Sequence, residues 1–170
     1  MNDKRKTNWS VVNMNKLIYL AGDMLSLGQQ KQRAEEKEKL EAIGYSVYSP
    51  QDDKSINDKK NANQDGLAER IVQNDFNGIN QSDMAVVDYL PHAQGTIAEL
   101  GMLYYHKLLN PTYTVYVHCT DIRQGTGHLP QDPNRVEFSV NQFVNGLILF
   151  VTDGIGIQSF NEICNELEEQ

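Results

Sequence analysis

The sequence predicts an α/β domain in which helices cover both faces of a parallel sheet. Short apolar runs rich in β-formers alternate along the chain with longer helical segments, which is the pattern of βαβ units. The chain has 170 residues, of which 39% are hydrophobic, and this size suits one domain with a single core. We therefore expect one domain over residues 16–170, preceded by a polar N-terminal extension at residues 1–15.

The first βαβ unit is predicted from three consecutive segments. "KLIYLAG", Lys16 to Gly22, is a β-type run, and "QQKQRAEEKEKLEAIG" contains good helix formers closed by Gly44 in the position after the helix. "YSVYSP" is then a short strand that Pro50 stops. Strand, helix and strand follow one another in the order that a parallel pair requires.

The same alternation continues to the end of the chain. Helices are predicted at residues 66–80, 95–109 and 156–170, and strands at residues 82–91 and 112–119. "VNQFVNGLILFVT" is ambiguous, and we expect a short helix leading into a final strand at Leu147 to Val151. The elements together predict a flavodoxin-like or Rossmann-like doubly wound sheet of about five parallel strands.

Two long polar segments lie outside this alternation, at residues 49–66 and 120–138. Loops of this length in a compact domain are functional or poorly ordered. Each is a candidate wall of an active site, and surface decoration is an equally good interpretation of either one.

Composition excludes several classes of function. The formal net charge of −8 disfavours a surface that neutralises nucleic-acid phosphates. No apolar run is long enough to span a bilayer and the opening residues lack an apolar signal core, so we expect a cytoplasmic protein without a membrane partner. Cys119 and Cys164 are far apart and have no ligand spacing, which indicates buried thiols with no disulfide or metal site.

Other motifs for chemistry are weak. The four histidines show no metal-ligand spacing, and no nucleophile elbow accompanies them. "DGIGIQS" contains a GxG, but Ser159 occupies the third glycine position and too little chain follows for a dinucleotide-binding unit. Acidic side chains therefore remain as the best candidates.

Acidic residues follow three of the predicted strands. Asp23 comes after the first, Asp52 and Asp53 after the second, and Asp88 after the third. Ligands of open α/β sheets bind at the carboxyl ends of the strands, although any one of these residues could instead cap a helix or form a turn.

Glu99 occupies an unusual position in the helix "GTIAELGMLYYHKLL". A helical wheel places one apolar stripe opposite this carboxylate, and Met102 and Leu103 flank it; the stripe consists of Ile97, Leu100, Gly101, Tyr104 and Leu108. Glu99 is then either a solvent-facing helix former or a group held for chemistry.

Asp75 falls within the apolar stripe of the preceding helix. That stripe consists of Ala68, Ile71, Val72, Phe76 and Ile79. A charge on a core-facing stripe costs several kcal/mol unless it is paired or hydrogen-bonded. We expect Asp75 to have a functional role or to belong to a buried network. An acid-rich pocket with a well-placed glutamate is typical of retaining glycosyl chemistry.

Three motifs resemble the nucleoside 2-deoxyribosyltransferase family over roughly residues 16–150. They are "LIYLAGDML", "AERIVQNDFNGINQSDMAVVDYLP" and "GTIAELGMLYY", in this order and spacing. The resemblance implies base exchange on 2′-deoxynucleosides with retention of configuration, with Glu99 as the covalent nucleophile and no cofactor or metal.

The resemblance also implies roles for other residues. Tyr19 would orient Glu99, and Asp75 would bind the sugar hydroxyls. Gly22, Asp88 and Gly95, which lie in the matched motifs, would contact substrate. Asn141 would reach into a neighbouring subunit's pocket, which implies a homo-oligomer with shared sites. The expected partners are small nucleosides and nucleobases.

One position departs from the family pattern. Well-known members carry an aspartate six residues before the nucleophile, where it contacts and helps to protonate the base, and this chain has Ala93 there. Asp23 is the leading replacement, and Gln94 and His92 are weaker ones.

Two other functions stay open on the sequence. A relative of the same fold hydrolyses nucleoside 5′-monophosphates, but it needs phosphate donors after the first strand, where this chain has Asp23. A non-catalytic nucleotide-sensing module is the alternative of another class, because fold does not fix function.

Overall fold

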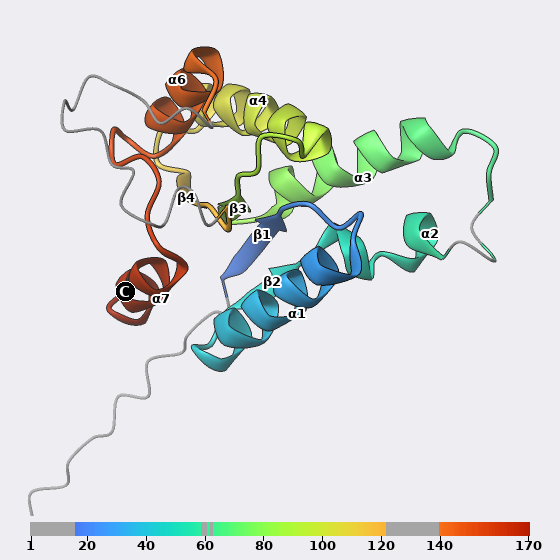
Figure 1. Ribbon diagram of the computed structural model, residues 1–170, viewed down its shortest axis with the longest axis horizontal. Coiled ribbons are helices and arrows are strands. Elements are labelled where there is room, and N and C mark those ends of the chain that lie inside the picture. Colours follow the sequence, from blue (N-terminus) through green and yellow to red (C-terminus); the bar gives the residue numbers. More distant parts are fainter. Residues whose placement is uncertain (1–15, 59–60, 62, 122–139) are drawn as a thin grey trace, which may run out of the picture.

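The fold is an α/β sandwich built on one parallel sheet, shown by the computed structural model in Figure 1. The structure describes residues 16–58, 61, 63–121 and 140–170, so the predicted extension at residues 1–15 lies outside it. Its elements are, in order, β1 (Leu17–Ala21), α1 (Leu27–Ala42), β2 (Ser46–Tyr48), η1 (Pro50–Asp52), α2 (Lys54–Asn57), α3 (Leu67–Gln81), β3 (Met84–Asp88), α4 (Gln94–Leu109), β4 (Thr114–His118), α6 (Gln142–Val151) and α7 (Phe160–Glu168).

The four strands of the described residues pair in parallel in the order β2-β1-β3-β4. Tyr19 of β1 is in register with Tyr48 of β2 on one side and with Ala85 of β3 on the other. The predicted α/β class and the doubly wound parallel sheet are therefore confirmed. The chain order reverses direction between β1 and β3, and the loops that follow these two strands diverge there.

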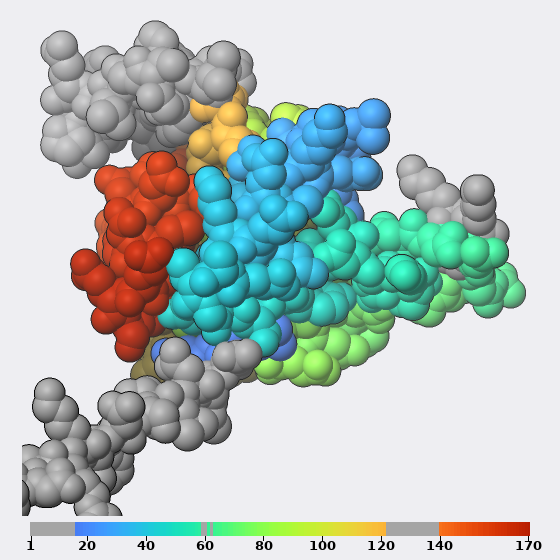
Figure 2. Space-filling view, turned by 90° about the horizontal axis from the view of Figure 1, so that it is seen from below, coloured from blue at the N-terminus to red at the C-terminus, as the bar shows by residue number. Residues whose placement is uncertain are grey.

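Alternation along the strands divides the core between two faces. Tyr19 and Ala21 of β1 pack with α3, α4 and α6, whereas Ile18 and Leu20 pack with α1 and α7. Figure 2 shows α1 and α7 side by side over the second face. The Tyr45 hydroxyl joins them by donating to the Leu167 carbonyl at 3.0 Å.

The predicted strand at Leu147 to Val151 is wrong, because these residues complete helix α6. Asn141 caps this helix by accepting a hydrogen bond from the Phe143 amide, and its buried residues recur with helical spacing at Val144, Ile148 and Val151. Beside β4, a single parallel bridge from Ile157 to Val117 takes the place of a fifth strand. Helical periodicity thus prevails over the apolar, strand-like composition of this run.

Helix α1, which connects β1 to β2, ends at the predicted glycine. Gly44 has a φ of +102°, a conformation that favours glycine, and the Tyr45 amide donates to the Leu40 carbonyl across it. Within the described residues, no helix combines the length and apolar character that crossing a bilayer needs.

Candidate active site

A cavity of about 380 Å³ lies at the carboxyl ends of β1 and β3, where the sheet order reverses. The residues that line it come from the β1–α1 loop, η1, α3, the β3–α4 loop and the first half of α4; they are Gly22, Asp23, Met24, Leu25, Pro50, Ile71, Asp75, His92, Ala93, Gln94, Gly95, Thr96 and Glu99. The described lining includes three carboxylates and no lysine or arginine.

Glu99 lines this cavity and is only 8% exposed. The predicted placement of Glu99 opposite the packing stripe of α4 is wrong, because the buried residues of this helix are Thr96, Glu99, Leu100, Leu103 and Lys107. Leu108, which the predicted stripe included, is largely exposed. Ile97 and Tyr104 of the predicted stripe pack against the core only in part, so the apolar composition of this stripe overstated its burial.

Tyr19 connects Glu99 to the sheet. Its hydroxyl donates a hydrogen bond to Glu99 Oε1 at 2.5 Å, and it is near enough to Asp75 to lower the pKa of that carboxyl. Since a phenol has one proton, the two carboxylates compete for it. Glu99, Asp75 and Tyr19 are thus brought together as predicted, on α4, α3 and β1.

The electrostatics of this group raise the pKa values of both carboxyls. Burial and, to a smaller extent, the charge of Asp75 raise the pKa of Glu99, hydrogen bonds from Tyr19 and Thr96 lower it, and the net value is about 7. Burial likewise raises the pKa of Asp75 to about 6. Burial and the neighbouring Glu99 raise the pKa of the Tyr19 phenol well above its ordinary value, so this group stays a donor.

Asp75 presents an open acceptor to the cavity. Its Oδ1 is buried and has no hydrogen-bond partner among the described residues. The predicted core-facing stripe around Asp75 is wrong in part, because Val72 and Phe76 are exposed while Ile79 is buried. Asp75 therefore borders a cavity and the core, and a ligand donor could satisfy the open oxygen.

The residues considered for the leaving base lie together at the β1–α1 and β3–α4 loops. Asp23 is 8% exposed, and its Oδ1 accepts a hydrogen bond from the Leu25 amide at 3.1 Å. Its Oδ2 lies 3.6 Å from Nε2 of the exposed His92. Ala93 and Gln94 line the same part of the cavity. Asp23 thus places an ionisable group in the same cavity as Ala93, which has none.

Two glycines line the cavity for different reasons. A Cβ at Gly22 would lie 2.1 Å from Nη1 of Arg33, so the close approach of that guanidinium requires a glycine. Gly95 has open space around it. Its lack of a side chain leaves the cavity wide at the start of α4.

Asp88 does not line this cavity. It is completely buried and receives hydrogen bonds from Arg33, at 2.6 Å, and from the Thr120 amide and hydroxyl, at 2.9 and 2.7 Å. Its partners hold it in a structural network below the cavity, so its geometry does not favour the predicted contact with substrate.

The other predicted residues lie outside the cavity. Asn141 is exposed at the start of α6. Asp52 pairs with Lys37 at 2.7 Å, and Asp53 caps α2. Of the two long loops, residues 49–58 form η1 and α2 beside the cavity, whereas most of residues 120–138 lie outside the described part of the chain.

Sequence reasoning missed the buried charges of α1. Arg33 and Glu36 are each 1% exposed and are linked at 2.7 Å, although they lie in a run of charged residues that is typical of a solvated helix. Only their spacing from buried Leu40 could have indicated a common inner face. The cysteines also differ from expectation, because both are partly exposed. No group of described residues has a composition that would hold a metal ion.

Comparison with known sequences gives two matches. The sequence model of one family, nucleoside 2-deoxyribosyltransferase, matches residues 18–166. An uncharacterized protein of Ureaplasma parvum serovar 3 is 28% identical over 141 residues, which cover 78% of this chain and 82% of that protein.

Two solved structures share the fold. A conserved protein from Enterococcus faecalis V583 superposes with a TM-score of 0.67 and 22% identity, covering 91% of this chain and 98% of that one. A 2-deoxyribosyltransferase from the psychrotolerant bacterium Bacillus psychrosaccharolyticus superposes with a TM-score of 0.58 and 16% identity, covering 88% and 90%.

Proposed function

The chain belongs to the nucleoside 2-deoxyribosyltransferase family, and we propose from this premise that it exchanges the nucleobases of 2′-deoxynucleosides through a covalent glycosyl–Glu99 intermediate. The observation that carries the proposal is the placement of Glu99. Its carboxylate is buried, is hydrogen-bonded to Tyr19, and lines the same cavity as Asp75, whose buried Oδ1 has no partner among the described residues.

In the first half-reaction, a Glu99 oxygen attacks C1′ of the donor nucleoside. The C1′–N bond breaks, its electron pair stays on the base, and a proton reaches the base from an acid beside it. The raised pKa of Glu99, about 7, gives a carboxylate that is more basic than an exposed glutamate and still substantially ionised near neutral pH.

In the second half-reaction, a nitrogen of the incoming base attacks C1′ of the deoxyribosyl ester. The ester C–O bond breaks, Glu99 leaves as the carboxylate, and the nitrogen's proton returns to the acid. Two inversions give overall retention of configuration. The buried open oxygen of Asp75 accepts hydrogen bonds from the sugar hydroxyls in both steps.

We assign the proton transfer to Asp23. This side chain is close to the cavity mouth formed by the β1–α1 loop, and His92 lies within 3.6 Å of its free oxygen. Protonation makes a base a better leaving group, and a carboxylic acid within reach of the base can supply that proton.

The lining favours a nucleoside over its 5′-monophosphate. The described residues around the cavity contribute three carboxylates and no lysine or arginine, so a phosphate dianion would meet like charge. We therefore propose neutral nucleosides and nucleobases as its partners, without a cofactor.

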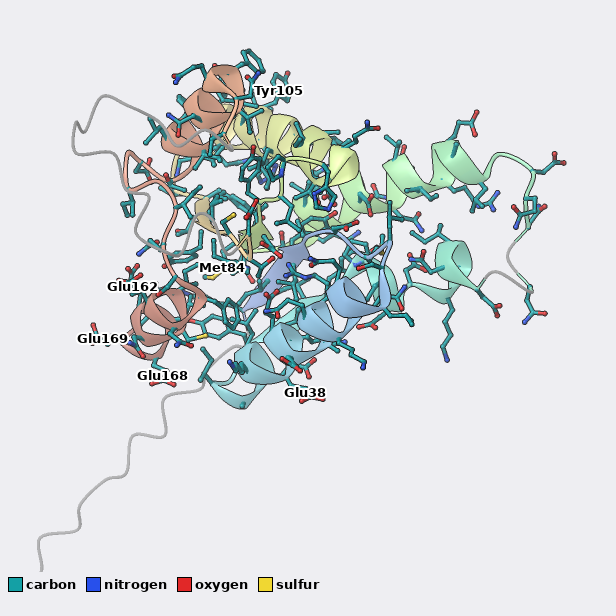
Figure 3. The ribbon with its side chains drawn as sticks, in the orientation of Figure 1. Glu38, Met84, Tyr105, Glu162, Glu168 and Glu169 are labelled. Carbon is teal, nitrogen blue, oxygen red and sulfur yellow. The ribbon has the colours of Figure 1, made fainter. Side chains whose placement is uncertain are left out.

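We further propose that a second copy of the chain completes the site through Asn141. Asn141 is exposed at the start of α6, and the outer sides of α4 and α6 expose large apolar side chains that a partner could cover: Tyr105, Leu108, Leu109, Phe143, Leu149 and Phe150. Figure 3 shows Tyr105 at the outer edge of this layer.

The test is incubation of the purified protein with deoxythymidine and adenine, followed by chromatography of the products. Transfer produces deoxyadenosine and thymine, and the Glu99→Ala variant should produce neither. Free deoxyribose with no deoxyadenosine would indicate a hydrolase, and unchanged substrates would indicate a sensing module. The same incubation with deoxythymidine monophosphate tests the nucleotide alternative.

A further inference from the structure

Two tyrosines, Tyr19 of β1 and Tyr48 of β2, pack closely against helix α3 near the site. The rings of Tyr19 and Tyr48 stack with their centroids 5.8 Å apart and an interplanar angle of 18°. Both rings lie against Gly78, where an added Cβ would be 2.7 Å from Tyr48 Cε1 and 2.9 Å from Tyr19 Cε2. Glycine in a helix interior costs roughly 0.5–1 kcal/mol relative to alanine, so this position sacrifices helix stability for close approach.

Gly78 lies on the same face of α3 as Asp75, because residues three apart are neighbours on a helix. One turn of the helix therefore presents the Asp75 carboxylate and, beside it, the hollow that receives the Tyr19 ring. The Tyr19 ring therefore meets Gly78 while its hydroxyl meets Glu99.

Tyr48 is held from its other end. Its hydroxyl donates to Asp53 Oδ2 at 3.4 Å, and the same oxygen accepts a hydrogen bond from Asn74 Nδ2 at 2.8 Å. Asn74 directly precedes Asp75 on α3. Tyr48 thus connects β2 and the cap of α2 to the turn of α3 that faces the site.

We propose that Gly78 and Tyr48 are positioning residues, which seat the Tyr19 ring so that its hydroxyl lies between Glu99 and Asp75 and aims the nucleophile. Neither residue lines the cavity, so they act through Tyr19 and not by contact with substrate. The inference rests on the proposed role of Glu99.

The main test compares Gly78→Ala with Gly101→Ala. Both changes add one methyl group to a helix, but Gly101 has nothing within 4 Å of its added Cβ. The methyl group at position 78 must displace one or both rings, and misplacement by about 1 Å can cost on the order of 100-fold in rate. We expect Gly78→Ala to lose 10- to 100-fold in kcat, on the order that such misplacement allows, with little change in KM. Gly101→Ala should match the wild type.

A pH profile separates positioning from a general loss of folding. The Tyr19 hydrogen bond lowers the pKa of Glu99, so displacement of the Tyr19 ring should raise that pKa. The acid limb of kcat/KM should therefore move to higher pH in Gly78→Ala and stay in place in Gly101→Ala. The same shift should appear in a ¹³C NMR titration of labelled glutamate, assigned with Glu99→Gln.

Tyr48 supplies a second pair of variants in case Gly78→Ala does not fold. Tyr48→Phe keeps the stacked ring and should retain most activity, whereas Tyr48→Ala removes the support and should reproduce the loss of kcat and the shift of the acid limb. Folded Gly78→Ala and Tyr48→Ala proteins with wild-type kcat and an unmoved limb would overturn the inference. A wild-type protein that transfers no deoxyribose would instead contradict the proposed function, and the NMR titration would still test the seating of Tyr19.

Discussion

The chemistry of Glu99 results from opposing influences on one carboxyl group. Burial and the charge of Asp75 raise its pKa, while hydrogen bonds from Tyr19 and Thr96 lower it. The result, about 7, leaves the group ionised in part at neutral pH. Since the carboxylate is the nucleophile, activity should rise with pH through this region.

Asp75→Asn tests the sugar-binding residue. The amide keeps the shape but weakens a charge-assisted hydrogen bond, so kcat/KM should fall by an amount worth about 1–3 kcal/mol. Removing the Asp75 charge should also lower the pKa of Glu99, which moves the acid limb to lower pH, opposite to the shift expected for Gly78→Ala. Steady-state kinetics over a pH series measure both effects.

Stability provides the control for this variant. Asp75→Asn relieves a partly buried charge, so its melting temperature should hold or rise, and Asp65→Asn, at an exposed loop position, should leave activity unchanged. If Asp75→Asn loses stability while its folded fraction reacts normally, Asp75 is structural.

Asp23→Asn tests the proton donor. Asparagine can still hydrogen-bond to a base but cannot transfer a proton to it, so departure of natural bases should slow by roughly 100-fold or more. Nucleosides whose bases leave without protonation should react at close to the wild-type rate. Equal slowing of natural and activated substrates would mean that Asp23 is not the proton donor. Its role would then be to shape the turn, through the hydrogen bond that it accepts from the Leu25 amide.

Individual residues could be predicted where they lie within one of the family-like sequence motifs. Glu99, Asp75, Tyr19 and Asp23 are brought together at one cavity. Asp88 could not be separated from them by sequence, because its partner Arg33 is 55 positions away and only the fold brings the two together.

At the scale of elements, α1 is anchored to the sheet by buried charges. Arg33 donates to the Ala21 carbonyl, to Glu36 and to Asp88, and His118 of β4 lies 3.5 Å from Glu36. Burial raises the pKa of Glu36 to about 7 and lowers that of His118 to about 4. This network fixes the β1–α1 loop that forms one wall of the cavity.

Glu36→Gln should change how stability depends on pH. The folded state binds the Glu36 proton more tightly than the unfolded state, whose pKa is near 4.5, so the wild type should lose stability as pH rises from about 4.5 to about 7. Titration of His118 has the opposite effect. Because its pKa is lower in the folded state, it adds to the stability of both proteins as pH rises from about 4 to about 6.5. Between pH 5 and pH 8, the free energy of unfolding of the variant should therefore rise relative to that of the wild type by up to about 3 kcal/mol.

Chemical denaturation at a series of pH values measures this difference. Glu38→Gln is the matched control, because Glu38 is exposed and directed away from the sheet (Figure 3). A constant difference between Glu36→Gln and the wild type at all pH values would show that Glu36 does not titrate in this range.

Most elements were predictable because their local signals agree with the tertiary structure. The failure at residues 147–151 has a local cause, since this apolar run suits a strand and also places Ile148 and Val151 on one helix face with Val144. The short helix α2 was missed because it has only 4 residues, too few to show a period.

At the scale of the whole molecule, the two helical layers differ in their outer surfaces. Figure 3 shows Glu38, Glu162, Glu168 and Glu169 directed outward from α1 and α7, whereas α4 and α6 expose Tyr105 and the apolar side chains named above. A partner copy would therefore cover the α4–α6 side, where Asn141 lies.

Complementation tests whether Asn141 acts in a neighbouring subunit. Glu99→Ala and Asn141→Ala should each be nearly inactive alone. Mixed and allowed to exchange subunits, they should recover activity, because a site with intact Glu99 then receives Asn141 from the other variant. Recovery to about a quarter of the wild-type rate is expected for random pairing in dimers. No recovery despite subunit exchange, verified by mass spectrometry, would place Asn141 outside the partner's site.

Covalent trapping of Glu99 tests the central claim most directly. A 2-fluoro deoxynucleoside slows both steps by destabilising the oxocarbenium-like transition state, and an added good leaving group lets the glycosyl-enzyme accumulate. After digestion, mass spectrometry should find one fluorosugar on the peptide that contains Glu99, and none in Glu99→Ala. A label on another residue, or turnover by Glu99→Ala at the wild-type rate, would contradict the account.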